Sequence, residues 1–522
     1  MRNALLISIL LVVGFHSMAY AEGSHAHGQR SCHASPEPES TPTPRVERPL
    51  EERGGFTLSL EPCLFETFDG RKTEAELGRL TVPENRHNPR SRLTELAFVR
   101  FKSTAKQPIP PVVYLAGGPG ASGIAAARGR RFDLFMAMRE LGDVIALDQR
   151  ATGMSKPGLE CRGKLGYPLD KPGDREDLLR RYREQSSKCR EELIRQGVDL
   201  AGYTIIESAD DVESLRQALA VERISLWSIS YGTQLALATI RRHERGIHRA
   251  ILAGVEGPDV TFKLPSAIQA HLATVARLAE QDAQISRHVP DLLQLMRGVH
   301  ERLESEPLIV EIDDSQTKQK ANVTLGKFDL QWMTAAMFVG GEAVFSLPAL
   351  HYAVWKRDAS TPDVRRWAQW IAGVRRGSVG SPMQIMIDCA SGGSPERLAR
   401  IRREEISTLV GRLTDYPLPD ICDAWGKPDL GSRFRTPVRS RVPVLLISGT
   451  LDGRTPVSNG EVVQKGFPNS AHLVIEGATH SDPLFLSSPK IKEAMVKFMR
   501  GLPVSTAKIT LPPPSFSPVA TR

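Results

Sequence analysis

The most constraining feature of this sequence is a strand pattern that passes into a helix pattern at a single serine. Ile224–Ile229 is an apolar run typical of a buried strand, and Tyr231–His243 has the periodicity of a helix. Ser230 stands at the junction, between Ser228 and Gly232. So sharp a turn strains its central residue and requires small neighbours, and it presents the side chain beside helix N–H groups. The segment therefore predicts a nucleophile elbow, with a serine in place of the first glycine of the G-x-S-x-G pattern.

Short apolar runs and amphipathic helical patterns alternate on both sides of this segment. Ser208–Ala220 predicts a helix with Ser208 as its N-cap. The other expected strands are Phe56–Phe65, Glu74–Val82, Thr94–Phe101, Pro111–Ala116, Asp143–Leu147, Arg249–Val255, Val442–Ser448 and His472–Ile475. Strands that alternate with helices favour an α/β fold, with a mostly parallel sheet covered by helices on both faces.

A long segment interrupts this alternation. Residues from about 259 to 436 are mainly helical in pattern and show few strand signals. A single core stops growing near about 250–300 residues, so a chain of 522 residues predicts two units or a core with a large insertion. We expect a core in two parts, 54–258 and 437–505, with a helical cap at 259–436. The proline-rich end at 506–522 is expected to be a frayed tail from Leu511 onward.

The first residues have the features of a secretory signal peptide. Arg2 precedes the apolar run Ala4–Phe15, and residues 19–21 form a small-x-small cleavage site. We expect residues 1–21 to be removed and the protein to be exported, either to a periplasm or out of the cell. The alternative is an uncleaved anchor, but the run is shorter than the about 20 apolar residues that span a bilayer. We therefore expect no stable membrane insertion after cleavage.

A polar, proline-rich arm at residues 22–53 follows the predicted cleavage site. It contains His25, His27, Cys32 and His33, and imidazole and thiolate groups are ligands for zinc and copper. No acidic or supporting partner is evident beside them, so we interpret the arm as a loosely attached tail. We expect no metal and no cofactor.

The sequence has six cysteines, all after the cleavage site, and an even number in an exported chain favours disulfides. No C-x-x-C pair supports a zinc ribbon or a thioredoxin-like site. The expected pairs, each closing a short loop, are Cys161–Cys189 and Cys389–Cys422, with Cys32 and Cys63 left to pair or to be free thiols. The net charge of +8, from 68 basic and 60 acidic residues, is mild and predicts no nucleic-acid or membrane partner.

Three further segments fit the elbow serine. A glycine-rich loop, Gly117–Gly120, directly follows a predicted strand, and the backbone N–H groups of Gly118 and Tyr231 would form an oxyanion hole. The alternatives for this loop are a simple turn or a phosphate loop, but a P-loop lysine is absent. Asp452 and His480 each follow a later strand. Ser230 would attack a carbonyl carbon, His480 would take and return its proton, and Asp452 would orient the imidazole.

The chain resembles the proline iminopeptidase and tripeptidyl aminopeptidase family of α/β-hydrolase serine peptidases, and most closely its exported branch. The resemblance covers roughly 56–258 and 437–500. The segments that carry it are AGGPGASG at 116–123, DQRATGMS at 148–155, SISYGT at 228–233, SGTLDGRTP at 448–456 and GATH at 477–480. It implies an α/β-hydrolase fold, removal of residues from free peptide N-termini, and Asp148 and Arg150 organising the active site.

The resemblance also implies carboxylates that hold the substrate ammonium group, and here the chain departs from the pattern. The exported branch tends to carry an aspartate two residues after a cysteine of the cap, where this chain has Ser391. Glu256, Glu342 and Asp388 are the candidates to replace it. The substrate is then a peptide or, if the enzyme is an esterase or amidase, a small acyl compound. A secreted binding protein without activity is a third hypothesis, and the sequence predicts no oligomeric state.

Overall fold

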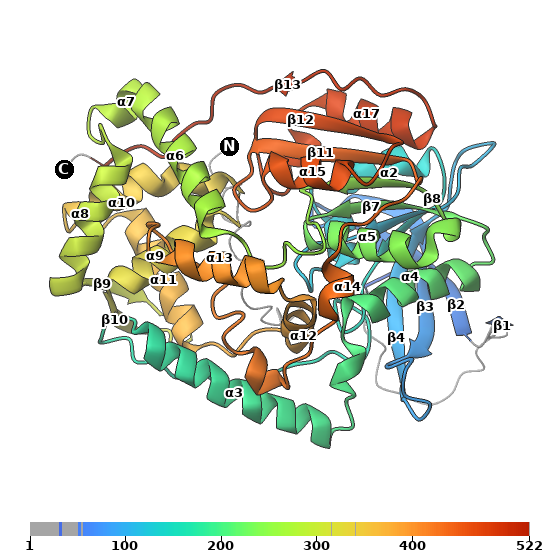
Figure 1. The fold of residues 1–522 in the computed structure, drawn as a ribbon, viewed down its shortest axis with the longest axis horizontal. Coiled ribbons are helices and arrows are strands. Elements are labelled where there is room, and N and C mark those ends of the chain that lie inside the picture. Colours follow the sequence, from blue (N-terminus) through green and yellow to red (C-terminus); the bar gives the residue numbers. More distant parts are fainter. Residues whose placement is uncertain (1–30, 34–50, 54–55, 315, 340, 521–522) are drawn as a thin grey trace.

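The computed structural model describes residues 31–33, 51–53, 56–314, 316–339 and 341–520 (Figure 1). The predicted signal peptide and most of the predicted N-terminal arm, including His25 and His27, lie outside the described residues.

An eleven-stranded sheet runs through one half of the molecule (Figure 1). The pairs from β1 to β4, and β4 with β6, are antiparallel, and every later pair is parallel. In order across the sheet the strands are β1 (Glu51–Arg53), β2 (Phe56–Glu66), β3 (Lys72–Pro83), β4 (Leu93–Phe101), β6 (Val144–Leu147), β5 (Val112–Leu115), β7 (Ile224–Ile229), β8 (Ile247–Ala253), β11 (Val444–Leu451), β12 (Ser470–Thr479) and β13 (Ile509–Thr510).

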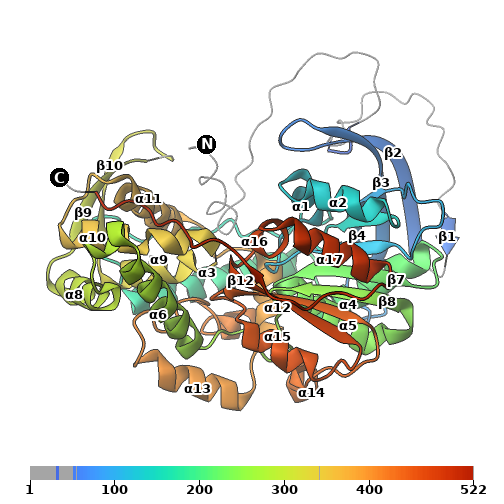
Figure 2. The same cartoon turned by 90° about the horizontal axis from the view of Figure 1, so that it is seen from above.

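Helices cover both faces of this sheet, as Figure 2 shows. One face carries α1 (Gly123–Arg128), α2 (Phe132–Arg139), α16 (Pro483–Leu486) and α17 (Pro489–Met499), and the other carries α4 (Ile205–Ala218), α5 (Tyr231–His243) and α15 (Val457–Gln464). Successive side chains of a strand point to opposite faces. On β7, Leu226 therefore packs into the core beneath α4 and α5, while Trp227 packs against Tyr114, Phe135 and Phe485 in the other core.

The expected insertion between β8 and β11 is rich in helices, and Figure 1 places it beside the sheet. Its helices are α6 (Pro265–Gln281), α7 (Ala283–Ser286), α8 (Leu292–Ser305), α9 (Lys327–Met337), α10 (Leu347–Trp355), α11 (Pro362–Arg376), α12 (Pro382–Ser391), α13 (Pro395–Glu405) and α14 (Gly431–Arg435). It also contains an antiparallel pair of strands that the sequence reading missed, β9 (Leu308–Asp313) and β10 (Lys320–Leu325). In β9 buried and exposed residues alternate, as in a strand with one covered face.

A long helix before the nucleophile segment also packs against the inserted residues. This helix is α3 (Arg175–Arg195). Its Tyr182 ring lies 5.9 Å from the ring of Tyr416, and Arg183 donates a hydrogen bond to the carbonyl oxygen of Asp420. The short 3-10 helices are η2 (Leu200–Gly202), η3 (Glu244–Gly246), η4 (Gly341–Ser346) and η5 (Cys422–Trp425). In the part of the chain described, no helix is both long enough and apolar enough to cross a bilayer.

Three disulfides are present, and they use every cysteine of the chain. Both pairs expected from the spacing are bonded, and the two cysteines left over are joined to each other: Cys161–Cys189, Cys389–Cys422 and Cys32–Cys63. In the same order, the sequence separations are 28, 33 and 31 residues. By chain entropy alone, a loop of that length contributes about 3–4 kcal/mol against unfolding. The Cys32 bond ties residues 31–33 to β2, so this part of the arm is attached to the sheet.

Two expectations about helix and chain ends were wrong. The helix expected at Ser208–Ala220 begins earlier, and its N-cap is Thr204, whose hydroxyl accepts a hydrogen bond from the N–H of Glu207. Ser208 is instead buried inside α4. When the packed face of a helix begins before a residue that matches the capping pattern, an earlier residue caps the helix instead.

The C-terminal segment is not frayed within the described residues. Ile509 pairs with Ile475 of β12, and the N–H of Leu511 donates to the carbonyl oxygen of Glu476. Further on, the Phe516 ring lies 5.6 Å from the Phe345 ring of η4. Figure 1 shows this segment running from the sheet to the inserted helices. Its prolines prevent a helix, but tertiary contacts still hold it in place.

Two buried histidines of the inserted segment lead us to predict how the stability of the protein changes at acidic pH. His300 of α8 and His351 of α10 have ring centroids 6.2 Å apart, and the Nε2 atom of each is buried without a partner. Burial lowers the pKa of His300 to about 3 and that of His351 to about 4. The unfolded chain takes up these protons near pH 6.5, whereas the folded chain does not. The stability due to neutral His351 is therefore lost progressively as the pH falls from about 6.5 to about 4.

Replacement His351→Asn should remove one of these titrations and keep a donor near the carbonyl oxygen of Leu347, which Nδ1 contacts at 2.9 Å. We expect the free energy of unfolding to fall less steeply with acidification, by about 1.4 kcal/mol per pH unit between pH 6 and 4.5. Denaturant unfolding over that range measures the slope. The exposed His87, changed to Asn, serves as the control, and equal slopes in the wild type and His351→Asn would contradict the prediction.

Candidate active site

Ser230 occupies a strained turn between β7 and α5. Its backbone angles are φ 55° and ψ −130°, and its N–H donates to the carbonyl oxygen of Ala253 at 3.0 Å. A side chain at Gly232 would lie 2.2 Å from the carbonyl oxygen of Leu115, so only glycine fits there. Positive φ at a residue other than glycine costs on the order of 1–3 kcal/mol and persists where the surrounding structure enforces it. The turn therefore has the conformation of the nucleophile elbow that the sequence predicts.

Ser230, His480 and Asp452 form a continuous hydrogen-bonded chain. The Nε2 atom of His480 lies 3.1 Å from Ser230 Oγ, and its Nδ1 atom lies 2.8 Å from Asp452 Oδ2. Each residue follows the carboxyl end of a strand, and those strands, β7, β11 and β12, lie near one another in the sheet. Ser230 is 7% exposed, so the hydroxyl is within a covered site. The arrangement has the distances that proton transfer from serine to imidazole requires.

The carboxylate of Asp452 is buried and held by four donors. Oδ1 accepts hydrogen bonds from the backbone N–H groups of Arg454 and Thr455, and Oδ2 accepts from Thr455 Oγ1 and faces His480. Burial acts to raise the pKa of Asp452, but His480 and the Thr455 hydrogen bonds outweigh it and lower the pKa below its usual value. The group is thus an anion that orients the Nδ1–H of His480.

Thr455 is a member of this site that the sequence reading missed. Its hydroxyl donates to Asp452 Oδ2 at 2.6 Å and lies 3.1 Å from His480 Nδ1. The available signal was the spacing, because a threonine three residues after an aspartate can reach its carboxylate across a turn.

The replacement Thr455→Val should therefore reduce kcat while it preserves the shape of the side chain. One hydrogen bond to a charged group is lost, which predicts a decrease of about 10- to 100-fold with little change in KM. Steady-state kinetics measure this, with Thr450→Val, at an exposed position of β11, as the control. Full activity of Thr455→Val would show that the backbone donors alone hold Asp452.

The expected oxyanion hole has its two donors available. Tyr231 begins α5, and neither its N–H nor that of Gly118 has an acceptor among the residues described. Gly117 approaches the nucleophile so closely that a side chain there would meet Ser230 Cβ at 3.1 Å. Gly118 has φ 115°, a conformation that favours glycine. The glycine-rich loop therefore brings backbone donors next to the serine hydroxyl.

Asp148 anchors the segment after this loop. Its carboxylate accepts hydrogen bonds from Ser122 Oγ at 2.6 Å, from the N–H of Ile124 at 3.1 Å and from the N–H of Met154 at 2.8 Å. Burial raises its pKa to about 6, against the effect of these donors. Asp148 thus joins the start of α1 to the turn around Met154.

Arg150, expected to organise the site together with Asp148, points elsewhere. Its guanidinium forms two hydrogen bonds with Asp211 of α4, at 2.8 and 2.7 Å, and a third with the carbonyl oxygen of Glu84. The side chain is fully buried, so this pairing offsets the cost of removing the charge from water. Arg150 holds α4 against the sheet and has no contact with the triad residues among its hydrogen bonds and ion pairs.

The three candidate carboxylates for a substrate ammonium group lie in different surroundings. Glu256 is buried and forms an ion pair with Lys263, 2.9 Å away. Asp388 is half-buried, and its carboxyl has no hydrogen bond or ion pair to any described residue. Burial raises the pKa of Asp388 to about 8, against the opposing effect of Lys263. Glu342 is exposed on η4, so the structure brings Glu256 and Asp388, but not Glu342, into one charged group around Lys263.

Inserted residues cover the triad from three sides. A side chain at Gly120 would lie 3.9 Å from Ser381 Oγ, one at Gly341 would meet the carbonyl oxygen of His480 at 2.7 Å, and one at Gly453 would meet the His271 ring at 2.6 Å. These contacts join the inserted segment to the oxyanion loop, the histidine loop and the aspartate loop. The inserted segment therefore lies against all three loops that form the site.

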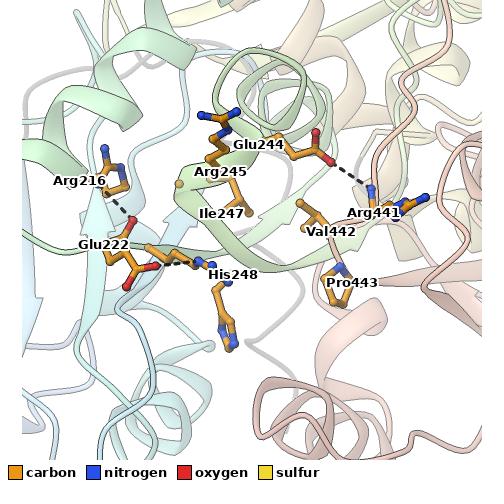
Figure 3. Close-up of a pocket in the computed structure, with 11 residues that line it drawn as sticks. Arg216, Glu222, Glu244, Arg245, Ile247, His248, Arg441, Val442 and Pro443 are labelled. Carbon is orange, nitrogen blue, oxygen red and sulfur yellow. Dashed lines mark hydrogen bonds and ion pairs between the residues drawn. The ribbon is translucent and has the colours of Figure 1, made fainter.

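A basic hollow lies at the opposite edge of the sheet (Figure 3). It is lined by the start of β8, by Arg216 of α4, by Arg245 of η3 and by Arg441, which stands just before β11. Glu222 and Glu244 also line it. The triad follows the carboxyl ends of the strands, so this hollow contributes nothing to it. Within the described ranges, no three His, Cys, Asp or Glu side chains gather as a metal site would require.

The comparisons with known proteins agree with this geometry. A family model described as alpha/beta hydrolase fold matches residues 110–485. The chain is 27% identical over 188 residues to the serine protease Hip1 of Mycobacterium tuberculosis, strain H37Rv, and of Mycobacterium bovis. The matched segments cover 35% of this chain and 36% of those relatives, so the match spans about a third of their length.

Among solved structures, a proline iminopeptidase of Mycobacterium smegmatis is 16% identical, with a TM-score of 0.38 over 81% of this chain and 97% of that one. An esterase of Thermogutta terrifontis is also 16% identical, with a TM-score of 0.34 over 81% of this chain and 98% of that one.

Proposed function

Because the chain belongs to the alpha/beta hydrolase fold family, we propose that it is an exported serine aminopeptidase, which releases residues or short peptides from free N-termini. The observation that carries the catalytic part is the hydrogen-bonded chain from Ser230 through His480 to Asp452, with the serine at a strained elbow. The M. tuberculosis relative is named a serine protease, which supports peptides as substrates.

In the proposed reaction, Ser230 Oγ attacks the substrate carbonyl carbon as its proton moves to His480 Nε2. The substrate oxygen gains negative charge, which the N–H groups of Gly118 and Tyr231 at the start of α5 stabilise. His480, oriented by Asp452, then gives the proton to the leaving amine. Water, activated by the same histidine, hydrolyses the acyl-enzyme on Ser230.

The proposed receptor for the substrate ammonium group is Asp388. Burial raises the pKa of the Tyr231 phenol, and Asp388 is the leading charge that adds to this shift, so its carboxyl lies near the residue after the nucleophile. A substrate ammonium group beside Asp388 would lower its pKa and favour the anion. Ser391, at the position where the exported branch has aspartate, is fully buried with no exposed surface, so it is not available to substrate.

An esterase or amidase is the second candidate function. It is favoured by one observation, the raised pKa of Asp388, because a carboxyl that is mostly neutral at pH 7 is a poor partner for a peptide ammonium group. The same triad would then cleave small acyl substrates without binding a substrate N-terminus.

Substrate comparison tests this proposal. We expect turnover of aminoacyl and short-peptide anilides with a free N-terminus, and much slower turnover of the same compounds after N-acetylation. Short acyl esters are assayed beside them, and mass spectrometry of a peptide mixture identifies the products. Turnover confined to simple esters would refute the aminopeptidase assignment and leave the esterase.

Export is proposed because disulfides form and persist in oxidising compartments, and the chain has three of them. Cell fractionation, with N-terminal sequencing of the purified protein, tests this. A mature chain that starts at Glu22 and is found outside the cytoplasm is the expected result. A reduced protein that retains residues 1–21 in the cytoplasm would contradict it.

A further inference from the structure

Arg454 is a cation placed beside the triad by the loop that carries the catalytic acid. It is the second residue after Asp452, and its backbone N–H donates to Asp452 Oδ1 at 2.9 Å. The next residue, Thr455, holds the same carboxylate through its N–H and its hydroxyl. The backbone of Arg454 is thus fixed relative to His480 and Ser230, and its side chain starts from a rigid point.

The guanidinium of Arg454 lacks a partner within the part of the chain described. Its side chain is half-buried, its Nη1 atom is buried without an acceptor, and the side chain has no hydrogen bond or ion pair to a described residue. By contrast Arg150 and Arg375, whose side chains are fully buried, pair with Asp211 and Asp329. A buried guanidinium N–H without an acceptor is costly, so a ligand that brings an acceptor oxygen to Nη1 would be stabilised there.

Arg454 lies where the aspartate loop meets the inserted segment, since a side chain at the neighbouring Gly453 would meet the His271 ring at 2.6 Å. Its charge acts on Asp388 and Asp415, both from the inserted segment that lies over the site. Asp388 in turn acts on Tyr231, the residue after the nucleophile. The cation is therefore within electrostatic range of carboxyl groups of the inserted segment and stands two residues after the catalytic acid.

None of the nearby carboxylates pairs directly with Arg454 among the described residues. Glu256 is paired with the Lys263 ammonium at 2.9 Å, and Asp415 accepts the backbone N–H of Lys263 at 2.6 Å. Burial raises the pKa of Asp388 to about 8, so its neutral form dominates. Lys263 is thus paired with a carboxylate, whereas the guanidinium of Arg454 forms no ion pair within the described residues.

We propose that Arg454 binds a carboxylate of the substrate, and that the preferred substrates are short peptides with a carboxylate close to the scissile bond. That carboxylate is either the free C-terminus of a di- or tripeptide or an acidic side chain. The planar fork of a guanidinium matches a carboxylate with two parallel hydrogen bonds, so the pair supplies geometry as well as charge. This inference rests on the proposed function and adds the substrate class.

The test compares matched substrates that differ only in one carboxylate. The first pair is a tripeptide acid and its C-terminal amide, and the second is a tripeptide amide with Glu or Gln after the released residue. For the wild type we expect kcat/KM to be at least about tenfold higher for the acid in at least one pair, mainly through KM. The pair that shows the difference identifies the source of the carboxylate.

Variants then assign this preference to Arg454. The ratio of kcat/KM for the acid to kcat/KM for its uncharged partner should fall to about one in Arg454→Gln. It should be partly kept in Arg454→Lys, which keeps the positive charge but not the planar guanidinium. Arg245→Gln, in the basic hollow at the opposite edge of the sheet, should leave the ratio and the activity unchanged. A wild-type ratio near one in both pairs, or an unchanged ratio in Arg454→Gln, would overturn the proposal.

A third pair separates this inference from the proposed function. If the wild type cleaves esters but no peptides, the aminopeptidase assignment fails. The same ratio is then measured for the 4-nitrophenyl esters of succinic acid and of its monomethyl ester. A preference for the free acid that disappears in Arg454→Gln would support Arg454 as the carboxylate receptor of an esterase, and equal rates would overturn it.

Discussion

Replacement of Ser230 by alanine should abolish hydrolysis, with a decrease in kcat on the order of 10⁶-fold. The only hydroxyl within hydrogen-bond distance of His480 Nε2 is that of Ser230, at 3.1 Å, among the described residues. Without it no acyl-enzyme can form, and only the binding and oxyanion contributions to rate are left. Steady-state assays and labelling with a fluorophosphonate probe both measure the loss.

Ser228→Ala is the matched control for this variant. Ser228 lies two residues earlier, on β7, and its hydroxyl donates to the carbonyl oxygen of Ile251 at 2.9 Å, away from the triad. We expect this variant to keep its activity and its labelling. If the wild-type protein neither turns over substrates nor reacts with the probe, the result would contradict the enzyme hypothesis and support a non-catalytic binding protein.

Replacement of Asp452 by asparagine should decrease kcat by about 10⁴-fold while the fold is retained. The backbone N–H groups of Arg454 and Thr455 require an oxygen at the Oδ1 position, so the new amide nitrogen takes the Oδ2 position that faces His480. The imidazole would then accept at Nδ1 and carry its proton on Nε2. In that tautomer it cannot take the proton of Ser230.

Kinetics and thermal unfolding, measured on the same preparation, check this prediction. Asp133→Asn, at an exposed position of α2, is the control and should match the wild type in both. Fluorophosphonate labelling should also slow in Asp452→Asn, because the probe needs an activated serine. Rapid labelling together with normal turnover would mean that another group orients His480.

Much of the fold followed from local patterns. The strand, the serine and the helix at 224–243 are found with the predicted bounds, because an apolar strand pattern meets a helix pattern there without a linker. The strands of the core were placed within a few residues for the same reason. Pairs of cysteines separated by 28 and 33 residues were predicted correctly, since nearby partners close the shortest loops.

Other parts could not be read from local patterns. The hairpin of β9 and β10 has only six residues in each strand, and it lies among long helical segments that dominate the periodicity. The C-terminal segment looks like a frayed tail, but contacts with Ile475 and Phe345, far away in the sequence, hold it. Ser208 matches a capping pattern, yet packing of α4 moves the helix start to Ile205.

The sequence by itself determined the fold class and the identity and order of Ser230, Asp452 and His480, because each of these features depends on residues adjacent in the chain. Only the tertiary structure decided what surrounds them. It brought His480 to Ser230 across 250 residues, added Thr455 to the acid and turned Arg150 away toward α4. It also left the guanidinium of Arg454 without a partner among the described residues. The physical reason is that hydrogen-bond satisfaction and burial depend on which distant residues pack together, and no local pattern encodes that distance.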